Sequence, residues 1–303
     1  MDILDQVGLV EGQLESLGIG SFRKGITYNF ITEIEEVKAS SPDFVFNLVE
    51  SINNKGQLIY FAPALLNLAQ IPYTGCPLES IFMTSNKPLA LKTMRLGGIP
   101  VAGSYSPDQI SLLHFGRQYI IKPIWEDGSM GITAESVFTY SPGDEERLAQ
   151  LPASHWFLED YIDGREFNVS MFSGSGGVVM LPPAEIEFRN YGTGRPRIVD
   201  FKAKWDTESF EYHNSVRVFP DDLETGGLYD KLLKVCTDCW SLFGLRGYAR
   251  IDIRTDNSDN VYVLEINANP CISPDSGFIA ACGAGGYTLD EVFGGIVTDL
   301  NRP

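Results

Sequence analysis

The segment VYVLEINANPCISPDSGF, residues 261–278, places two polar side chains inside an apolar run. Glu265 and Asn267 are two positions apart, and in a β-strand such residues point to the same face of the sheet. The preceding segment, GYARIDIRTDNSDN at 247–260, has strand character and ends in turn-forming residues. Together the two segments predict a β-hairpin whose faces differ in polarity.

If the hairpin is symmetric about its turn, Asp252 lies opposite Glu265 and Arg250 lies opposite Asn267. Two carboxylates directly across a ladder repel each other and destabilise the sheet. A divalent cation between them would remove this cost, and the oxygens of Asp, Glu and Asn suit Mg²⁺. A solvent-facing acidic surface explains the spacing equally well, so a second signal is needed to decide between the two.

A second signal is the segment YIIKPIWEDGSMGIT, residues 119–133. Its β-branched strand carries Lys122 and leads into a loop with Gly128, Ser129 and Gly131, where backbone N–H groups can surround phosphate oxygens. The chain contains neither the P-loop pattern GxxxxGK[ST] nor a complete GxGxxG. The segment therefore indicates a different kind of nucleotide site, although an ordinary strand followed by a turn would have the same sequence pattern.

A third segment, WFLEDYIDGREF at 156–167, is an apolar strand that ends in acidic residues. Glu159 and Asp160 close the strand, and Glu166 follows a turn. The edge groups of such a strand can hold an adenine, and a carboxylate commonly binds ribose hydroxyls. A plain strand, turn and strand would also fit this segment.

The composition is that of a globular protein: of 303 residues, 44% are hydrophobic and 21% are charged, which is enough for two or three packed units. There are 40 acidic and 23 basic residues, and the net charge of -17 opposes binding to nucleic acid and anionic membranes. No apolar run is long enough to cross a bilayer, and the start lacks a signal-peptide pattern. We expect a cytoplasmic protein with no nucleic-acid or membrane partner.

The five cysteines are scattered, which is typical of reduced thiols. Cys236 and Cys239 form a CxxC, but Leu232 and Phe243 continue the same helical spacing. No second CxxC or neighbouring histidine completes a zinc site. We interpret both cysteines as buried helix residues.

The chain divides into two parts by the pattern of its elements. The first part alternates helix and strand, which predicts an open parallel sheet covered by helices. Because it begins inside a helix, we expect the first strand of this unit to be missing. The expected elements are a helix ending at residue 17, a strand at 43–50, and helices at 57–69 and 86–96.

From residue 118 onward strands dominate, which predicts an α+β arrangement. Helices are expected at 221–243 and at 278–300. The loop NYGTGRPR, residues 190–197, is polar and contains glycine, so it fits a mobile lid and a simple hairpin connection equally well.

Taken in order, Lys87 and the segments IKPIWEDGSMGI, FLEDYIDGREF, FKAKW, ARIDI and LEINANP resemble the ATP-grasp carboxylate–amine ligases, most closely the D-alanine–D-alanine ligase group. The resemblance covers nearly the whole chain. It implies an ATP-grasp fold with an N-terminal α/β domain at 1–85, a central lobe at 86–168 and a C-terminal lobe with the metal site at 169–303. The two lobes would clamp ATP between them.

The resemblance also implies roles for individual residues. Contacts with ATP are implied for Lys87, Lys122, Ser129, Glu159, the backbone at Ile162, and Glu166. Catalytic roles are implied for Arg250, Lys204 and the backbone N–H near Cys271, while Ser276 would bind the carboxylate of the acceptor. Two Mg²⁺ ions, for which Mn²⁺ is an alternative, would be bound by Asp252, Glu265 and Asn267.

The implied reaction transfers the γ-phosphoryl group of ATP to a carboxylate, and an amine then attacks the acyl phosphate. The substrates would be small molecules, either amino acids or small peptides, and relatives commonly form homodimers. One alternative is the D-alanine–D-alanine ligase of cell-wall synthesis itself. Another is a nucleotide-binding protein without ligase turnover.

Three departures from the D-alanine–D-alanine ligases concern the first substrate. Gly128 stands where those ligases carry a serine, and Trp205 stands where their lid carries a tyrosine. The glutamate that follows their first strand has no counterpart here. We therefore expect ATP and Mg²⁺ binding to be retained, and the departures argue against a strict D-alanine specificity.

Overall fold

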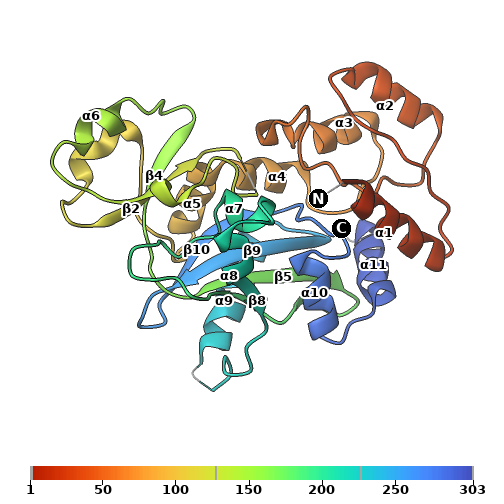
Figure 1. Ribbon diagram of the computed structural model, residues 1–303. Coiled ribbons are helices and arrows are strands. Elements are labelled where there is room, and N and C mark those ends of the chain that lie inside the picture. Colours follow the sequence, from red (N-terminus) through yellow and green to blue (C-terminus); the bar gives the residue numbers. More distant parts are fainter. Residues whose placement is uncertain (1–2, 127, 226, 302–303) are drawn as a thin grey trace.

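The computed structural model describes residues 3–126, 128–225 and 227–301, which form two antiparallel sheets surrounded by helices (Figure 1). The helices are α1 (Ile3–Ser16), α2 (Phe30–Ala39), α3 (Phe61–Ala69), α4 (Leu78–Ser85), α5 (Lys87–Leu96), α6 (Asp144–Ala149), α7 (Phe201–Trp205), α8 (Phe210–Asn214), α9 (Leu228–Leu242), α10 (Gly277–Ala284) and α11 (Leu289–Thr298). The strands are β1 (Ser104–Tyr105), β2 (Gln118–Pro123), β3 (Val137–Thr139), β4 (Trp156–Asp160), β5 (Glu166–Gly174), β6 (Gly177–Met180), β7 (Ala184–Phe188), β8 (Ser215–Val218), β9 (Tyr248–Thr255) and β10 (Val261–Asn267).

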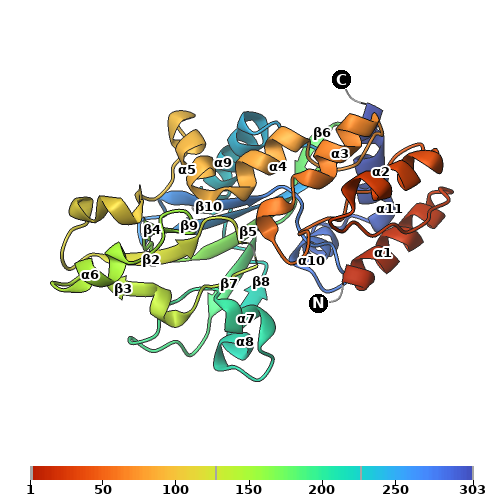
Figure 2. The same cartoon turned by 90° about the horizontal axis from the view of Figure 1, so that it is seen from above.

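The larger sheet has the strand order β10-β9-β5-β7-β8, with β6 paired to β5, and the smaller sheet has the order β1-β4-β2-β3. Helices α4, α5 and α9 cover one face of β9 and β10, while α7 and α8 lie with β7 and β8 on the other side (Figure 2). The covered face is apolar: Val169 of β5 and Ile251 of β9 are fully buried in the same core as Leu91 and Leu232. The opposite face is therefore the one that carries the polar residues of these strands.

A β-bulge in β10 decides which of its side chains enter the core. Val261 and Val263 pack in the core, and so does Ile266, although strict alternation would point Ile266 the other way. The register shifts between Val263 and Glu265, so that one extra residue, Leu264, is inserted. Such an insertion exchanges the two faces of the strand beyond it.

The hairpin prediction is confirmed at its polar end. Glu265 pairs with Asp252 and Asn267 pairs with Arg250, as symmetry about the turn predicts. The bulge itself was not predicted, because the side chains of residues 261–267 are compatible with either register until the core is assembled.

The predicted strand at 43–50 is reduced to a single parallel bridge between Val45 and Tyr73. The reason is that side chains replace ladder hydrogen bonds beyond it. The backbone N–H of Asn47 donates to Thr74 Oγ1 at 3.3 Å, and that of Val49 donates to Asn47 Oδ1 at 3.2 Å. Within the described residues, the parallel pairing expected of the first part is thus limited to isolated bridges, this one and a second between Val101 and Val263 of β10.

Most of the other predicted elements are present with shifted ends. The predicted helix at 221–243 begins at Leu228, and β3 follows a short 3₁₀ turn at Ala134–Ser136. Cys236 and Cys239 are both fully buried in α9, as interpreted from their spacing. The elements that were not predicted from the sequence are α2, α4, α6, α7, α8, β1 and β8.

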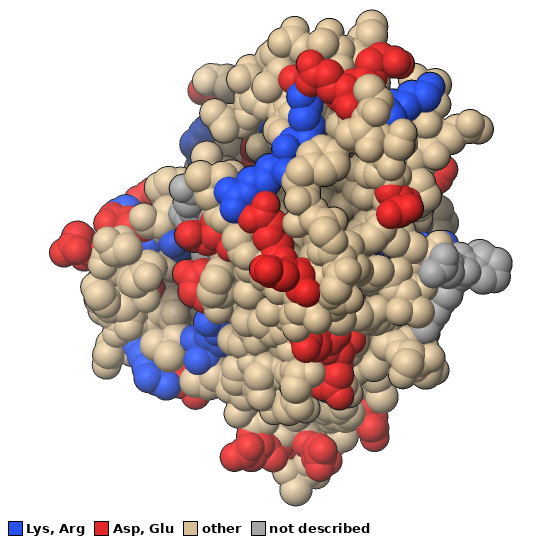
Figure 3. Space-filling model, turned by 90° about the vertical axis from the view of Figure 1, so that its right-hand side faces the viewer, with Lys and Arg blue, Asp and Glu red and all other residues tan. Residues whose placement is uncertain are grey.

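Surface charge is dispersed on the face shown in Figure 3, where basic side chains lie beside acidic ones. Exposed ion pairs of this kind include Arg23 with Glu11 and Lys24 with Glu36. Within the described part of the chain, no helix is both long and apolar enough to span a bilayer.

Two adjacent glycines of α11 test how tightly this helix packs on β5. A Cβ on Gly295 would lie 2.4 Å from the carbonyl oxygen of Ser173, whereas a Cβ on Gly294 would lie at an ordinary 3.9 Å from Leu17 Cδ2. We expect Gly295→Ala to lower the free energy of unfolding by about 1–3 kcal/mol, because overpacking forces the helix away from the strand. Chemical denaturation measures this loss.

The matched control is Gly294→Ala in the same helix. Because alanine is a better helix former than glycine, this variant should be as stable as the original protein or more stable by up to about 1 kcal/mol. Equal stabilities of the two variants would contradict the packing described for α11.

Candidate active site

Three rows of polar residues lie on the face of β5, β9 and β10 that is turned away from α4, α5 and α9. The first row joins β5 and β9, and the other two continue onto β10. The strand registers align them directly across the ladder. The rows are Glu166 with Arg254; Asn168 with Asp252 and Glu265; and Ser170 with Arg250 and Asn267. The polar face is thus built from residues two apart in each strand, as the pleat requires.

The two facing carboxylates are each bound by a cation of the protein. Arg250 Nε and Nη2 donate to the two oxygens of Asp252 at 2.7 and 2.8 Å, which is a bidentate pair. Lys87, at the start of α5, places its Nζ 3.2 Å from Glu265 Oε2. The repulsion expected between Asp252 and Glu265 is therefore relieved by neighbouring cations even without a metal ion.

Burial and the neighbouring cations together shift the pKa values of Asp252 and Glu265 in opposite directions. Burial raises the pKa of Asp252 even though the Arg250 guanidinium opposes the shift. Burial would also raise the pKa of Glu265, but the positive charges of Lys87, Lys204 and Arg250 outweigh it and hold that pKa well below its usual value. Glu265 is thus the carboxylate that stays ionised most firmly.

The donor atoms on this face fit a hard divalent cation. Asp252 and Glu265 face each other, and the Asn267 amide reaches Asp252 Oδ2 at 3.3 Å. Two carboxylates and an amide supply oxygen ligands and no sulfur or imidazole, as Mg²⁺ prefers. Within the described residues, no group of three His, Cys, Asp or Glu side chains is placed to hold a metal ion.

A second buried ion pair lies on the smaller sheet. Lys122 of β2 and Glu159 of β4 are 9% and 1% exposed, and Lys122 Nζ donates to Glu159 Oε2 at 2.5 Å. The other carboxylate oxygen, Oε1, is buried and has no hydrogen-bond partner. A buried acceptor in this state is costly unless a ligand supplies a donor.

A cleft of about 90 Å³ is lined by residues of both sheets and of the segments between them. Its apolar lining consists of Ile120, Ile132, Ile162, Ile198, Val199 and Leu264. Its polar lining consists of Lys87, Lys122, Glu126, Ser129, Asp160, Tyr161, Glu166, Asn168, Lys204, Asp252, Arg254 and Glu265. The cleft combines an apolar slot with a charged end, which is the usual form of a site for a small charged ligand.

Three hydrogen bonds close a lid over this cleft. We call residues 128–132 the flap and residues 190–205 the lid. Ser129 Oγ donates to Val199 O at 2.6 Å, and Trp205 Nε1 donates to Gly128 O at 2.8 Å. A backbone bond of 3.0 Å from residue 201 of the lid to residue 132 of the flap completes the closure. Lys204 lies in the lid and lines the cleft, where burial and Arg250 lower the pKa of its ammonium group.

The structure brings most of the predicted site residues together. Eight of them line the cleft: Lys87, Lys122, Ser129, Ile162, Glu166, Lys204, Asp252 and Glu265. Glu159, Arg250 and Asn267 are joined to it through Lys122 and Asp252.

Cys271 and Ser276 follow β10 and do not line the cleft. Ser276 is the N-cap of α10, where its hydroxyl accepts from the backbone N–H of Ile279 at 3.2 Å. The intervening backbone N–H of Ile272 donates to Gln6 Oε1 of α1 at 3.0 Å. This segment is thus held by the N-terminal helix.

Several cleft residues were not predicted from the sequence, among them Asn168, Tyr161 and Arg254. Asn168 lies two residues after Glu166, and Arg254 lies two residues after Asp252. The two-residue period that selected Glu265 and Asn267 could therefore have found both. Tyr161 gave no such signal, because only the closed lid brings its hydroxyl to the backbone of Arg197, at 3.1 Å.

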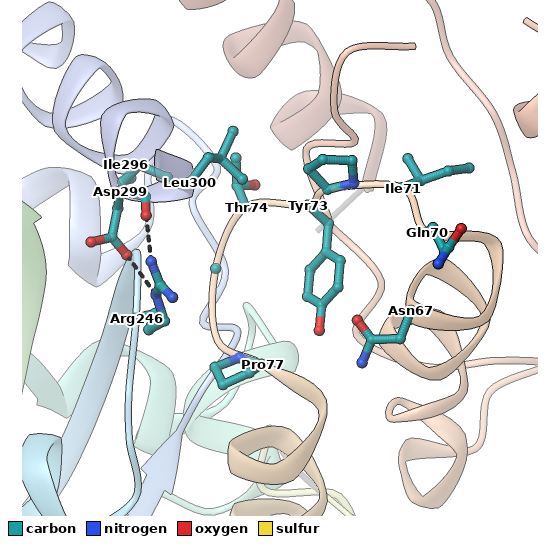
Figure 4. Close-up of a pocket in the computed structure, with 12 residues that line it drawn as sticks. Asn67, Gln70, Ile71, Tyr73, Thr74, Pro77, Arg246, Ile296, Asp299 and Leu300 are labelled. Atoms are coloured by element: carbon teal, nitrogen blue, oxygen red, sulfur yellow. Dashed lines mark hydrogen bonds and ion pairs between the residues drawn. The ribbon is translucent and has the colours of Figure 1, made fainter. Parts of the chain in front are cut away.

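A larger cavity, of about 290 Å³, lies between the end of α3, the loop that follows it, and α11 (Figure 4). Its charged residues satisfy each other: Arg246 Nε donates to Asp299 Oδ2 at 3.4 Å, and the Gly247 N–H donates to the same oxygen at 3.0 Å. Tyr73 and Asn67 add polar edges. The predicted site residues lie elsewhere, so the size of this cavity does not mark the site.

Comparison with protein families and known sequences gives consistent matches. The family model for the D-ala D-ala ligase C-terminus matches residues 115–298. The uncharacterized protein y4sG of Sinorhizobium fredii is 26% identical over 275 residues, which cover 87% of this chain and 76% of that protein. The D-alanine–D-alanine ligase of Rickettsia bellii is 27% identical over 271 residues, which cover 86% of this chain and 77% of the ligase.

Solved structures share the fold. A D-alanine–D-alanine ligase from Bacillus anthracis, complexed with ATP, superposes with a TM-score of 0.64 at 19% identity and covers 89% of this chain and 82% of its own. The VanG D-Ala:D-Ser ligase from Enterococcus faecalis gives a TM-score of 0.64 at 18% identity, with 85% and 73% covered.

Replacement of Lys122 by methionine tests how the interior tolerates Glu159. The variant leaves a buried carboxylate without its cation, so we expect the free energy of unfolding at pH 7 to fall by about 3–5 kcal/mol. Burial raises the pKa of Glu159, and Lys122 opposes this shift. Without Lys122 the folded protein takes up a proton more readily than the unfolded chain, so the loss should shrink as the pH falls from 8 to 5.

Denaturation curves of the original protein and the variant at pH 5 and pH 8 measure this dependence. The double variant Lys122→Met with Glu159→Gln should recover part of the loss at pH 8, because no charge remains buried. A loss independent of pH would show that Glu159 is not the group left uncompensated.

Proposed function

The chain belongs to the D-alanine–D-alanine ligase family and is an ATP-dependent carboxylate–amine ligase, and we propose which of its residues carry out each part of this reaction. The observation that carries the proposal is the cleft in which Lys87, Lys122 and Lys204 converge on Asp252 and Glu265. Such a concentration of cations beside oxygen ligands, in a protein of net charge -17, suits a metal-bound polyphosphate.

We propose that the adenine of ATP occupies the apolar slot of the cleft. The unpaired Oε1 of Glu159 would accept a hydrogen bond from an exocyclic amino group. The backbone at Ile162, where the chain passes from the smaller to the larger sheet, would bind the edge of the base. Glu166 would bind the ribose hydroxyls, since a carboxylate accepts from both of them.

Lys87, Lys122 and Ser129 would hold the phosphate groups. Lys87 is 5% exposed, and its Nζ is held by Glu265 and by the Glu126 carbonyl, to which it donates at 2.7 Å. The flap backbone around Ser129 would supply N–H donors. Ser129 and Gly128 both have positive φ, 63° and 64°, and such turns expose successive N–H groups to an anion.

Asp252, Glu265 and Asn267 would hold Mg²⁺, in two ions by the family resemblance. When bound, Mg²⁺ neutralises charge on the phosphoryl group during its transfer. The residues themselves orient that group: Arg250 fixes the Asp252 carboxylate in one plane, and Lys87 fixes Glu265.

Lys204, Arg250 and the backbone N–H near Cys271 would act on the reacting carboxylate. An acyl phosphate forms when the carboxylate takes the γ-phosphoryl group, and attack by the amine then places negative charge on the carbonyl oxygen. Arg250 and the N–H would stabilise this charge, and the loss of one such donor typically costs about 3 kcal/mol of barrier. Ser276 at the start of α10 would bind the carboxylate of the acceptor.

The substrates are small molecules, and we propose that they are amino acids or small peptides. The named relatives include D-alanine–D-alanine and D-Ala:D-Ser ligases, so D-alanine–D-alanine ligation is the second candidate. Neither Gly128 nor Trp205 has a hydroxyl to offer the first substrate, and the two residues are instead joined by a hydrogen bond from the indole N–H to the carbonyl oxygen.

We propose three units, residues 1–85, 86–168 and 169–303, with nucleotide bound between the last two. The second boundary falls inside β5, whose residues 166–168 already pair in the larger sheet. We therefore place the hinge just before β5, around residues 161–165. We also propose a cytoplasmic enzyme that forms a homodimer and binds neither nucleic acid nor membrane.

Measurement of ADP release tests the function directly. With ATP and Mg²⁺, pairs of D- and L-amino acids are screened, and products are weighed by mass spectrometry. We expect ADP release to require an amino acid and Mg²⁺, and the product mass to equal that of the two amino acids less one water. Asp252→Asn should raise the Mg²⁺ requirement at least as much as loss of an outer-shell partner does, roughly 10–100-fold.

The matched control is Asp259→Asn, in the exposed turn of the same hairpin. It should leave the Mg²⁺ requirement unchanged. ATP binding without amino-acid-dependent ADP release would instead indicate a nucleotide-binding protein without turnover, and a product from D-alanine alone would establish the second candidate.

A separate prediction concerns the lid. Trp205→Phe keeps an aromatic ring but removes the N–H that bonds to Gly128 O, which should let the lid open about 2–10-fold more often. Because acyl phosphates hydrolyse when water enters, ADP released per product should rise above one. Tyr212→Phe, which alters an exposed aromatic residue of the neighbouring helix α8, is the control and should keep the ratio at one. An unchanged ratio in the Trp205 variant would argue against closure by this bond.

A further inference from the structure

Arg254 is a buried cation in the cleft to which no role has yet been given. It is 3% exposed and lies opposite Glu166 in the pairing of β9 with β5. Its guanidinium carbon is 5.3 Å from the centre of the Tyr161 ring and 5.7 Å from that of Phe188. Arginine is rarely buried to this extent unless each donor is bound, so the partners of its guanidinium indicate what it does.

The guanidinium of Arg254 joins three separate segments. Nε donates to Glu166 Oε2 at 3.0 Å, and Nη2 lies 2.9 Å from the same oxygen. Nη1 donates to the carbonyl oxygen of Ile162 in the hinge at 2.5 Å. Nη2 also donates to the carbonyl oxygen of Arg197 in the lid.

The lid is held at this point from a second side. The Tyr161 hydroxyl accepts from the backbone N–H of Arg197 at 3.1 Å, while Arg254 binds the carbonyl of the same residue. The backbone N–H of Arg197 is therefore bound by Tyr161 of the hinge, and its backbone carbonyl is bound by Arg254 of β9. This arrangement fixes the lid beside the carboxylate of Glu166.

The contact with Glu166 is one-sided. Nε and Nη2 of Arg254 both contact Oε2 of Glu166. The guanidinium therefore fixes the carboxylate in one orientation and does not cover Oε1. A carboxylate that is already oriented loses less side-chain entropy when a hydroxyl binds it.

We propose that Arg254 is a positioning residue that presents Glu166 to the ribose hydroxyls and locks the lid to the hinge before ATP arrives. It thereby sets the preference of the enzyme for ribonucleotides over deoxyribonucleotides. The inference rests on the proposed function, in which Glu166 binds ribose. It goes beyond that function by assigning the selectivity to a residue of β9 that acts through Glu166.

The experiment compares ATP with 2′-deoxy-ATP and 3′-deoxy-ATP in the complete enzyme. A hydrogen bond between a hydroxyl and a carboxylate is worth roughly a tenfold difference or more, so we expect kcat/KM to favour ATP by at least about tenfold. Arg254→Met should bring this ratio close to one, mainly through a higher KM for ATP with a smaller change in kcat. Glu166→Gln should do the same, and the double variant should lose little more than either single one.

The matched control is Arg189→Met. Arg189 is an exposed arginine beside the lid, and its guanidinium is bound to Glu187 at 2.7 Å. Its removal should leave the nucleotide preference unchanged. Arg254→Lys covers the case in which the methionine variant folds poorly, because lysine keeps the positive charge but lacks the planar fork whose separate nitrogens bind Glu166, Ile162 and Arg197. It should fold and still lose most of the preference.

Hydrogen exchange of the ligand-free protein gives an independent readout. Amides of residues 190–199 should exchange faster in Arg254→Lys and as before in Arg189→Met. A variant with lower thermal stability but an unchanged ratio of ATP to deoxy-ATP would show a purely structural role and overturn the inference. If the unaltered protein binds no nucleotide, the proposed function fails with it; if it binds ATP but does not discriminate against deoxy-ATP, only the role of Arg254 fails.

Discussion

The active-site cleft depends on one backbone constraint, the bulge at Leu264 in β10. Before it, Val263 points into the core beneath α4, α5 and α9. After it, Glu265 and Asn267 lie on the polar face, where Glu265 lines the cleft, and Ile266 takes over the core position. With an unbroken two-residue period, the polar pair would be buried among apolar side chains. The proposed metal ligands therefore owe their direction to the insertion of a single residue.

The cleft also depends on charge balance within the protein. Four buried or half-buried carboxylates are each bound by a cation, in the pairs Asp252 with Arg250, Glu265 with Lys87, Glu159 with Lys122 and Glu166 with Arg254. Buried ion pairs contribute little net stability, because desolvation offsets their attraction. The four pairs do hold cations and oxygen atoms in fixed orientations, and such preorganisation would leave little rearrangement for the nucleotide and metal ion proposed above.

Much of this could be predicted from the sequence, but the reasons differ between elements. Helices such as α5 and α9 show their apolar period within one segment, and the pairing of Asp252 with Glu265 follows from a turn close by in the chain. The prediction of a strand at 43–50 was wrong, because the backbone of this segment forms hydrogen bonds with side chains from distant segments, Thr74 and Asn269. The lid contacts of Trp205 and Tyr161 could not be predicted from the sequence either, because they form only when the flap, the hinge and the lid come together in the fold.

By itself the sequence determined the two-residue and helical periods, the order of the motifs, and therefore the family and the residue types of the site. These are local properties, fixed by the pleat of a strand or the turn of a helix. Only the tertiary structure decided which cation neutralises which carboxylate and which oxygen remains for a ligand. The partners Lys122 and Glu159 are 37 residues apart, and Arg254 and Glu166 are 88 apart. Such pairs are chosen by the packing of whole sheets, because an ion pair forms only where the fold brings two side chains within a few ångströms.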